Sequence, residues 1–169
     1  NNLDTETTIH WHGIRLDNKF DGVPDLTQEA VKPGDSFMYE LIFPDPGLYW
    51  YHPHLREDYQ QELGLYGMIF VNPVNGDQFN EVNREEIFVI DDILIEGEDV
   101  LDFDKESTNL ALMGRFGNIM LVNGETDYKL NVKKGEVVRF YFANVANTRT
   151  FNLMIPGSRM KLVGSDGGL

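Results

Sequence analysis

The sequence contains no cysteine, so disulfide bonds, thiolate nucleophiles and thiolate metal ligands are excluded for this chain of 169 residues. It also lacks any apolar run near the roughly 20 residues that a membrane-spanning helix requires. Basic residues are few, with 14 Lys and Arg against 28 Asp and Glu and a net charge of -14. This acidity argues against nucleic acid or an anionic membrane as a partner, and solubility accounts for it most simply.

Histidine is also scarce, but its placement is informative. The chain has four histidines, and all lie in two H-x-H pairs, His10 and His12 in TTIHWHGIRL and His52 and His54 in LYWYHPHL. Side chains two residues apart in a strand point to the same side, so each pair projects together and the four imidazoles can converge. A lone histidine is usually a satisfied polar group, whereas two such pairs indicate a metal site. Imidazoles without a built-in carboxylate or thiolate favour copper or zinc over calcium or magnesium.

Strand patterns dominate the sequence. Short apolar or alternating runs bounded by Gly, Pro, Asn and Asp predict strands within residues 7–16, 36–44, 47–54, 65–73, 85–95, 118–124, 128–132, 136–145 and 150–155. In SFMYELIF, the alternating apolar side chains from Phe37 to Phe43 share one face, as in a half-buried strand. A helical pattern is limited to REDYQQELG, 56–64, where we expect a short helix or a solvated turn. Short strands at this spacing favour an all-β sandwich or barrel.

The chain divides into two strand-rich blocks. The polar segment 72–86, NPVNGDQFNEVNREE, carries Pro73 and Gly76 and separates the blocks. We therefore predict a first domain over 1–75, which carries both histidine pairs, and a second domain over 76–169, which carries none.

The second block repeats the first without its histidines. VKPGD in the first block recurs as VKKGE in the second, and NLDTETTI aligns without gaps on NVANTRTF. Under this alignment Asn152 takes the place of His10 and Met154 that of His12. A predicted strand precedes the repeated unit in the second block but not at Asn1, and GSDGGL stops where the first block continues. We therefore expect both domains to be incomplete and the chain to be a piece of a longer protein.

The histidine motifs carry a family resemblance. HWHG is followed 40 residues later by HPH, with a DG turn and a PG strand start between them, and the similarity continues through LMGRFGNIMLVNGE to GSDGG. The chain resembles the N-terminal portion of a multicopper oxidase of the laccase-like family. The resemblance implies two cupredoxin-like Greek-key β-sandwich domains in tandem. It also implies copper as the cofactor, since such proteins hold a mononuclear type 1 copper and a trinuclear cluster bound by eight histidines from four motifs.

The resemblance also implies a role for each candidate residue. His10 would bind the type 2 copper, while His12, His52 and His54 would bind the type 3 pair. Asp21, nine residues after His12 in FDG, matches an acidic residue of the family that lies beside the type 2 copper and is similar to a proton relay for O2 reduction. Asp-Gly is also a common turn pair, so a plain turn is the alternative interpretation of Asp21.

The type 1 copper site of the family has no counterpart in this chain. Type 1 copper needs a cysteine thiolate, and where related domains have H-C-H this sequence has Pro53 between His52 and His54. Asp58 and Leu63 occupy later positions at which a histidine and an axial ligand are expected. The resemblance therefore puts the type 1 copper and the other four cluster histidines outside this chain, which alone should be inactive.

Three functional classes are consistent with these motifs. The leading interpretation is an oxidase that couples one-electron oxidation of a phenol, an aromatic amine or a metal ion to four-electron reduction of O2 to water. It would work with further cupredoxin domains of the same protein or a neighbouring subunit, in an extracellular or periplasmic location. A non-catalytic copper-binding or structural cupredoxin module also fits the absence of cysteine. A dinuclear zinc hydrolase or a dismutase uses H-x-H too, but HWHGIR lacks the Asp-His that follows it in the common hydrolase pattern.

Overall fold

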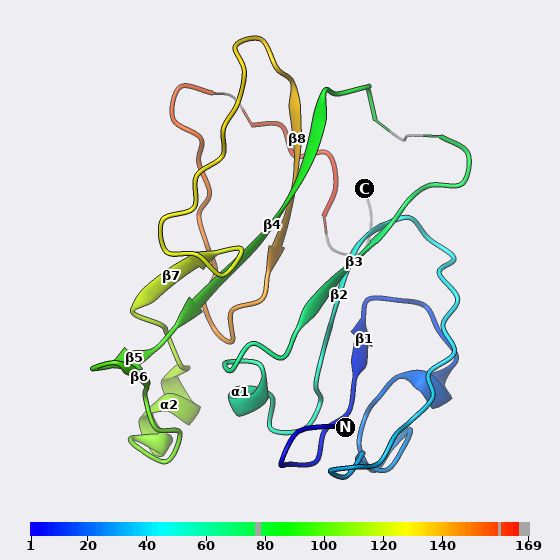
Figure 1. Ribbon diagram of the computed structural model, residues 1–169, viewed down its shortest axis with the longest axis vertical. Coiled ribbons are helices and arrows are strands. Elements are labelled where there is room, and N and C mark those ends of the chain that lie inside the picture. Colours follow the sequence, from blue (N-terminus) through cyan, green and yellow to red (C-terminus); the bar gives the residue numbers. More distant parts are fainter. Residues whose placement is uncertain (77–78, 159, 166–169) are drawn as a thin grey trace.

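The computed structural model describes residues 1–76, 79–158 and 160–165 (Figure 1). Its strands form two three-stranded sheets and one two-stranded sheet. No helix in these three ranges is long and apolar enough to cross a membrane. The last four residues of the predicted second domain, 166–169, lie outside the described part of the chain.

The first sheet is built from the block that carries the histidines. In spatial order it contains three antiparallel strands, β1 (His10–His12), β2 (Gly47–His52) and β3 (Gly67–Val71). Aromatic and β-branched residues are frequent in β2 and β3, and such side chains pack well on a pleated surface. The register pairs His10 with His52 and His12 with Trp50, so the first motif lies beside His52 at the end of β2, and His54 follows two residues beyond that strand.

The second sheet mixes antiparallel and parallel pairs. In spatial order it contains β7 (Ile119–Val122), β4 (Arg84–Ile93) and β8 (Val138–Asn144). β4 runs antiparallel to β7 and parallel to β8, and the parallel pair is seen as two adjacent long arrows in Figure 1. Parallel neighbours need a long crossover connection. Here the crossover contains β7 and a small two-stranded sheet of β5 (Ile95–Glu96) and β6 (Asp99–Val100).

The helices are short. They are η1 (Asn18–Phe20), α1 (Glu57–Gln60) and α2 (Ser107–Met113). α1 lies within 56–64, where the sequence predicts a short helix. The sequence does not predict α2, because this helix spans only seven residues and buries none of them, so it shows no apolar period of 3.6 residues.

Aromatic packing joins the two larger sheets. Phe88 on β4 packs against Phe140 and Phe142 on β8, with ring centroids 5.2 and 5.5 Å apart. Phe70 on β3 lies 4.7 Å from Tyr141 on β8 in an edge-to-face arrangement. This last pair bridges the sheets, so the histidine-bearing block is packed directly on the second block.

Three predicted strands are absent from the described residues, since 36–44, 128–132 and 150–155 are irregular. In the first of them Phe37 and Phe43 remain 39% and 40% exposed, so the predicted apolar face is not buried. A strand persists only where a neighbouring strand pairs with its N–H and C=O groups. These segments have the alternating sequence of a strand, but no strand in the described ranges pairs with them.

Candidate metal centre

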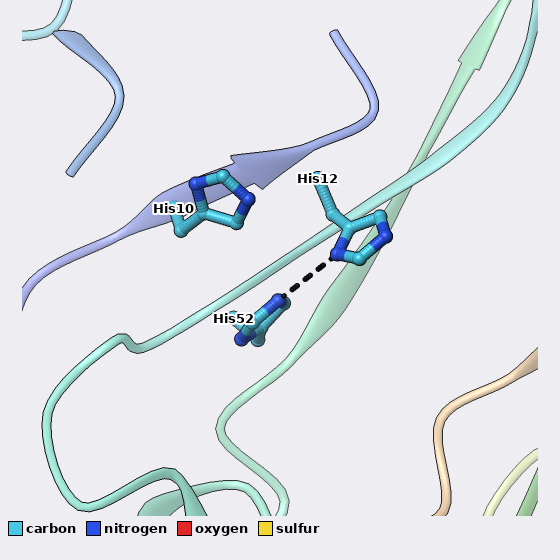
Figure 2. A group of neighbouring side chains, drawn as sticks. All are labelled: His10, His12 and His52. Atoms are coloured by element: carbon cyan, nitrogen blue, oxygen red, sulfur yellow. Dashed lines mark hydrogen bonds between the residues drawn. The ribbon is translucent and has the colours of Figure 1, made fainter. Parts of the chain in front are cut away.

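The two histidine motifs meet because β1 and β2 are adjacent antiparallel strands (Figure 2). The ring centroid of His10 lies 5.7 Å from that of His12, 5.4 Å from that of His52 and 4.8 Å from that of His54. The His52 ring in turn lies 5.5 Å from that of His12 and 5.6 Å from that of His54. These four imidazoles, from residues far apart in the chain, form one group that we call the histidine cluster.

Three of the imidazoles present nitrogens to a common space. His10, His12 and His52 each offer one ring nitrogen, and these atoms lie within 4.8 Å of one another. His12 Nδ1 and His52 Nε2 lie 3.3 Å apart and share the hydrogen bond drawn as a dashed line in Figure 2. Two nitrogens that each lie about 2.0 Å from one tetrahedral ion are about 3.3 Å apart. This pair therefore has the spacing of two ligands of a single ion, while His54 lies outside this group of three, with its ring beside that of His10.

The outer nitrogens of His10 and His52 are held by backbone oxygens. His10 Nδ1 lies 2.7 Å from the carbonyl oxygen of Asp21, and His52 Nδ1 lies 2.9 Å from that of Pro53. Because a carbonyl oxygen can only accept, each Nδ1 carries the proton and each Nε2 carries the lone pair, which in His52 accepts the hydrogen bond from His12 Nδ1. In His12 the nitrogen that faces the cluster is Nδ1 instead.

The environment of His52 favours the form that binds metal. Its side chain is buried, and withdrawal from water lowers the pKa of His52 below its usual value. The nearby imidazoles of His10 and His12 act in the same direction, while the Pro53 carbonyl opposes it. Metals bind the neutral imidazole. A set of neutral imidazoles whose ring nitrogens converge fits copper or zinc.

Asp21 lies against His10, as a member of the Asp-Gly turn. Besides the carbonyl contact, its carboxylate Oδ1 is 3.3 Å from His10 Nδ1. Gly22 permits this approach, because it has φ 74° and a Cβ at this position would lie 1.9 Å from the carbonyl oxygen of Ile9. The same bend that contains Asp21 and Gly22 therefore also places the Asp21 carboxylate beside the histidine cluster. The proton-relay role of Asp21 stays a prediction.

Trp50 covers one side of the histidine cluster. Its ring stacks on that of His52 at 4.2 Å with an angle of 27° between the planes, and it lies 5.0 Å from the ring of His12. Trp11 follows the alternation of β1 to the other face of the sheet, where it packs with Tyr51 at 5.5 Å. The flat ring of Trp50 therefore restricts the rotation of two imidazoles.

Sequence reasoning missed Glu57 and Thr8. Glu57 Oε1 lies 2.6 Å from His54 Nδ1, and the buried Thr8 Oγ1 accepts a hydrogen bond from His54 N at 3.3 Å. The signal for Glu57 is its place three residues after His54 at the start of a helical turn, a spacing that brings side chains together. No local pattern marks Thr8, since its contact with His54 spans 46 residues.

The segment around α1 is expected from the sequence to be solvated, which is wrong for its C-terminal part. Gln60, Gln61 and Glu62 are only 1%, 7% and 8% exposed. Gln60 Nε2 donates to the carbonyl oxygen of Glu6 at 2.9 Å, and Gln61 Nε2 donates to that of Val145 at 2.7 Å. These buried amides are satisfied by backbone carbonyls from both blocks, which explains why they leave water.

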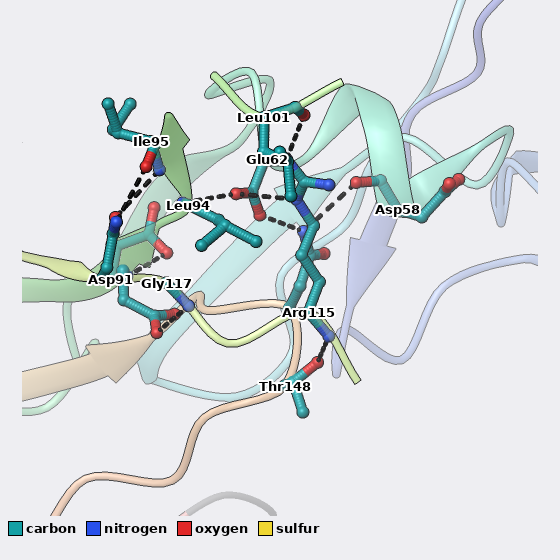
Figure 3. Close-up of polar contacts among 12 residues, drawn as sticks. Asp58, Glu62, Asp91, Leu94, Ile95, Leu101, Arg115, Gly117 and Thr148 are labelled. Atoms are coloured by element: carbon teal, nitrogen blue, oxygen red, sulfur yellow. Dashed lines mark hydrogen bonds and ion pairs between the residues drawn. The ribbon is translucent and has the colours of Figure 1, made fainter. Parts of the chain in front are cut away.

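Glu62 anchors the same segment to the second block (Figure 3). Its carboxylate pairs with Arg115 Nε at 3.1 Å, and it accepts hydrogen bonds from Leu94 N at 3.0 Å and Asn147 Nδ2 at 2.8 Å. The side chains of Glu62 and Arg115 are 2% and 7% exposed. We call Gln60, Gln61, Glu62, Arg115 and Asn147 the junction cluster. It fixes the chain that follows His54 against the second block.

Comparison with known protein families covers both blocks. A family model described as Multicopper oxidase matches residues 1–76, and a second with the same description matches residues 74–169. This chain belongs to the multicopper oxidase family. Multicopper oxidases bind copper, and the histidine cluster is compatible with a copper site.

Individual relatives of this multicopper oxidase chain agree with the family assignment. Copper resistance protein A of Escherichia coli is 27% identical over 99% of this chain and 34% of its own length. Multicopper oxidase mco of Staphylococcus aureus is 29% identical over 99% of this chain and 37% of its own length. The chain thus spans about a third of the length of these curated relatives.

Solved structures show the same relationship. The multicopper oxidase of Pseudomonas thermotolerans has a TM-score of 0.83 and 35% identity, over 93% of this chain and 38% of that chain. A laccase from Botrytis aclada has a TM-score of 0.66 and 27% identity, over 86% of this chain and 29% of that chain. These neighbours are cupredoxin-fold multicopper oxidases, which confirms the predicted all-β, cupredoxin-like fold.

Proposed function

We propose that this chain is the N-terminal portion of a laccase-like multicopper oxidase and supplies half of the histidine ligands of a trinuclear copper cluster. The histidine cluster carries the proposal: all four histidines of the chain gather on and beside two neighbouring strands, with adjacent ring centroids 4.8 to 5.7 Å apart. His12 Nδ1 and His52 Nε2 share one hydrogen bond, and an ion between the rings would replace it. A bound ion that accepts their converging lone pairs accounts for the arrangement.

The proposal assigns a ligand role to each imidazole. His10 binds the type 2 copper, and the other three histidines bind the type 3 pair. The 3.3 Å separation of His12 Nδ1 and His52 Nε2 supports a single type 3 ion shared by these two residues. Nε2 of His54 is then the ligand of the other type 3 ion.

Bound copper would supply one-electron redox chemistry, so that four one-electron oxidations of a substrate are coupled to the reduction of O2 to two waters. This chain's own residues hold the imidazoles neutral and oriented. Asp21 is the proposed proton relay: its side chain is 31% exposed and contacts His10, so it can exchange protons with water beside the site. Trp50 shields the imidazoles of His12 and His52 on one side.

The rest of the proposed oxidase lies outside this chain. We place the first domain at 1–75 and the second at 76–169, with the type 1 copper and four more histidines in further cupredoxin domains or a neighbouring subunit. One relative is named a copper resistance protein and another a laccase. Phenols, aromatic amines and metal ions such as Cu(I) are therefore the reducing substrates to compare, in a protein located outside the cytoplasm, extracellular or periplasmic.

The test uses the complete gene product loaded with copper. We expect O2 consumption with a phenol or Cu(I) as donor, four electrons taken from the donor for each O2, and loss of turnover in His52→Ala. Copper bound without O2 consumption would instead support a non-catalytic copper-binding module. Zinc binding with ester hydrolysis, and no copper-dependent O2 consumption, would overturn the proposal.

A further inference from the structure

The outer nitrogen of His54 is held by a side chain. Its Nδ1 lies 2.6 Å from Glu57 Oε1, whereas the outer nitrogens of His10 and His52 lie next to backbone carbonyl oxygens. A backbone carbonyl is present whichever side chain the residue carries. The orientation of His54 therefore depends on the side chain at position 57, whereas the Nδ1 atoms of His10 and His52 keep a backbone acceptor whichever side chains surround them.

The backbone takes a rare conformation that brings Glu57 to His54. Arg56, the N-cap of α1, has φ 48° and ψ 54°, a left-handed conformation that residues other than glycine seldom adopt. Its guanidinium makes two hydrogen bonds to the carboxylate of Asp58, at 3.0 and 3.2 Å. This pair clamps the residues on either side of Glu57. Strained backbone of this kind concentrates at functional sites.

α1 is also anchored at its C-terminal end. Gln60 is 1% exposed, donates to the carbonyl oxygen of Glu6 at 2.9 Å and accepts a hydrogen bond from Thr7 Oγ1 at 2.6 Å. Because α1 has only four residues, contacts at Gln60 also hold Glu57 in place. The Glu57 side chain is 45% exposed and so has water within reach, yet its carboxylate contacts His54.

We propose that Glu57 is a positioning residue for His54, and this inference rests on the proposed role of His54 as a copper ligand. The Glu57 carboxylate accepts the Nδ1 proton of His54, which fixes the tautomer and leaves Nε2 as the metal-binding atom. A carboxylate behind a ligating imidazole also makes the ring a stronger donor. Glu57 acts through His54 and does not itself bind copper.

Three variants of the full-length protein test this role. Glu57→Ala removes the acceptor, while Glu57→Gln keeps an oxygen that can accept the Nδ1 proton but removes the charge. Glu98→Ala is the matched control, because Glu98 is an exposed carboxylate in the turn between β5 and β6. Far-UV circular dichroism and thermal unfolding of the copper-free proteins establish that each variant is folded. If Glu57→Ala does not fold, the copper affinity of Glu57→Gln carries the test, and an affinity equal to that of the parent protein overturns the proposal.

The first readout is copper affinity, measured by competition with a chromophoric chelator. Loss of a group that supports a ligand weakens metal binding about 10- to 100-fold. We expect this loss in Glu57→Ala, a smaller loss in Glu57→Gln and none in Glu98→Ala. Copper affinity of Glu57→Ala equal to that of the parent protein would overturn the proposal.

The second readout needs no metal. In copper-free protein with 15N-labelled histidine, the ring-nitrogen signals report which nitrogen carries the proton, and His54→Gln identifies the signals of His54. We expect the Nδ1–H tautomer in the parent protein and in Glu57→Gln, and a shift toward Nε2–H in Glu57→Ala. An unchanged tautomer in Glu57→Ala would overturn the proposal. If the parent protein binds no copper, the proposed function fails, whereas this readout still decides whether Glu57 orients His54.

Discussion

The histidine cluster and the junction cluster remove polar groups from water in different ways. In the junction cluster the partners are complementary, since the Glu62 carboxylate meets the Arg115 guanidinium and the Asn147 amide. In the histidine cluster the groups are alike. The outer nitrogens of His10, His52 and His54 contact oxygen atoms of the protein, and the inner nitrogens of His12 and His52 face each other. A carboxylate and a guanidinium of opposite charge stabilise each other within the fold, whereas under the proposed function a bound ion would complete the converging imidazoles.

The largest expected difference between the two clusters is in copper binding at His10. His10→Ala removes one ligand, so copper affinity should fall by more than the about 100-fold expected for a lost supporting group. Copper content after dialysis of the full-length protein against a chelator measures this loss. The control is Asn152→Ala, at the position that matches His10 in the second block. Equal copper retention in both variants would contradict the assignment.

The junction cluster should show the largest effect on stability. Glu62→Ala leaves the buried Arg115 guanidinium without its carboxylate, which costs about 3–5 kcal/mol in the free energy of unfolding. Urea denaturation of the copper-free protein measures the change. Lys105→Ala breaks the exposed ion pair with Glu96 and should cost less than about 1 kcal/mol. Similar costs for the two variants would show that burial of the junction cluster does not matter.

Thr8 lies at the border of the histidine cluster and tests what a single buried hydrogen bond there contributes to stability. Thr8→Val keeps the shape of this 1% exposed side chain but leaves the His54 N–H without its acceptor. The expected cost is about 1–2 kcal/mol in the free energy of unfolding, again measured by urea denaturation. Thr126→Val, at an exposed position, is the control. A neutral Thr8→Val would mean that the hydrogen bond contributes nothing.

Asp91 is a half-buried carboxyl group outside both clusters, and its substitution should have the smallest effect of these variants on stability. Burial raises the pKa of Asp91 above its ordinary value of 3.8, although the hydrogen bond from Tyr66 opposes the shift. The folded state therefore holds this proton more tightly, and its contribution to the free energy of unfolding decreases as the pH rises from 3.8 through the raised pKa. Asp91→Asn should remove this decrease, so the variant gains stability relative to the parent across that interval. Parallel pH profiles from urea denaturation would contradict the prediction.

The strands show which parts of the fold an alternating sequence pattern predicts. β2, β3 and β8 lie within stretches that the sequence predicts as strands. SFMYELIF at 36–43 has a similar alternating pattern but is irregular in the structure. Alternation determines which side chains share a face, whereas pairing depends on a neighbouring strand that the segment itself does not specify.

The surroundings of the histidines show a similar limit. Asp21 could be singled out from the sequence because a glycine follows it and a motif resemblance includes it. Glu57 carries only the signal of its spacing from His54, and Glu62 carries none, since an acidic residue in a polar segment is most often solvated. Their roles depend on a helix of four residues and on contacts with Arg115, which is 53 positions beyond Glu62 in the chain.

By itself, the sequence determined which side chains are candidate metal ligands, because all four histidines lie in H-x-H pairs and this spacing turns His10 and His12 to one side of β1. It also determined the absence of a thiolate site in this chain. Only the tertiary structure decided that His12 Nδ1 meets His52 Nε2 at 3.3 Å and that Trp50 covers both rings. His12 and His52 are 40 residues apart, and the strand register and the intervening turns that bring them together are properties of the whole fold.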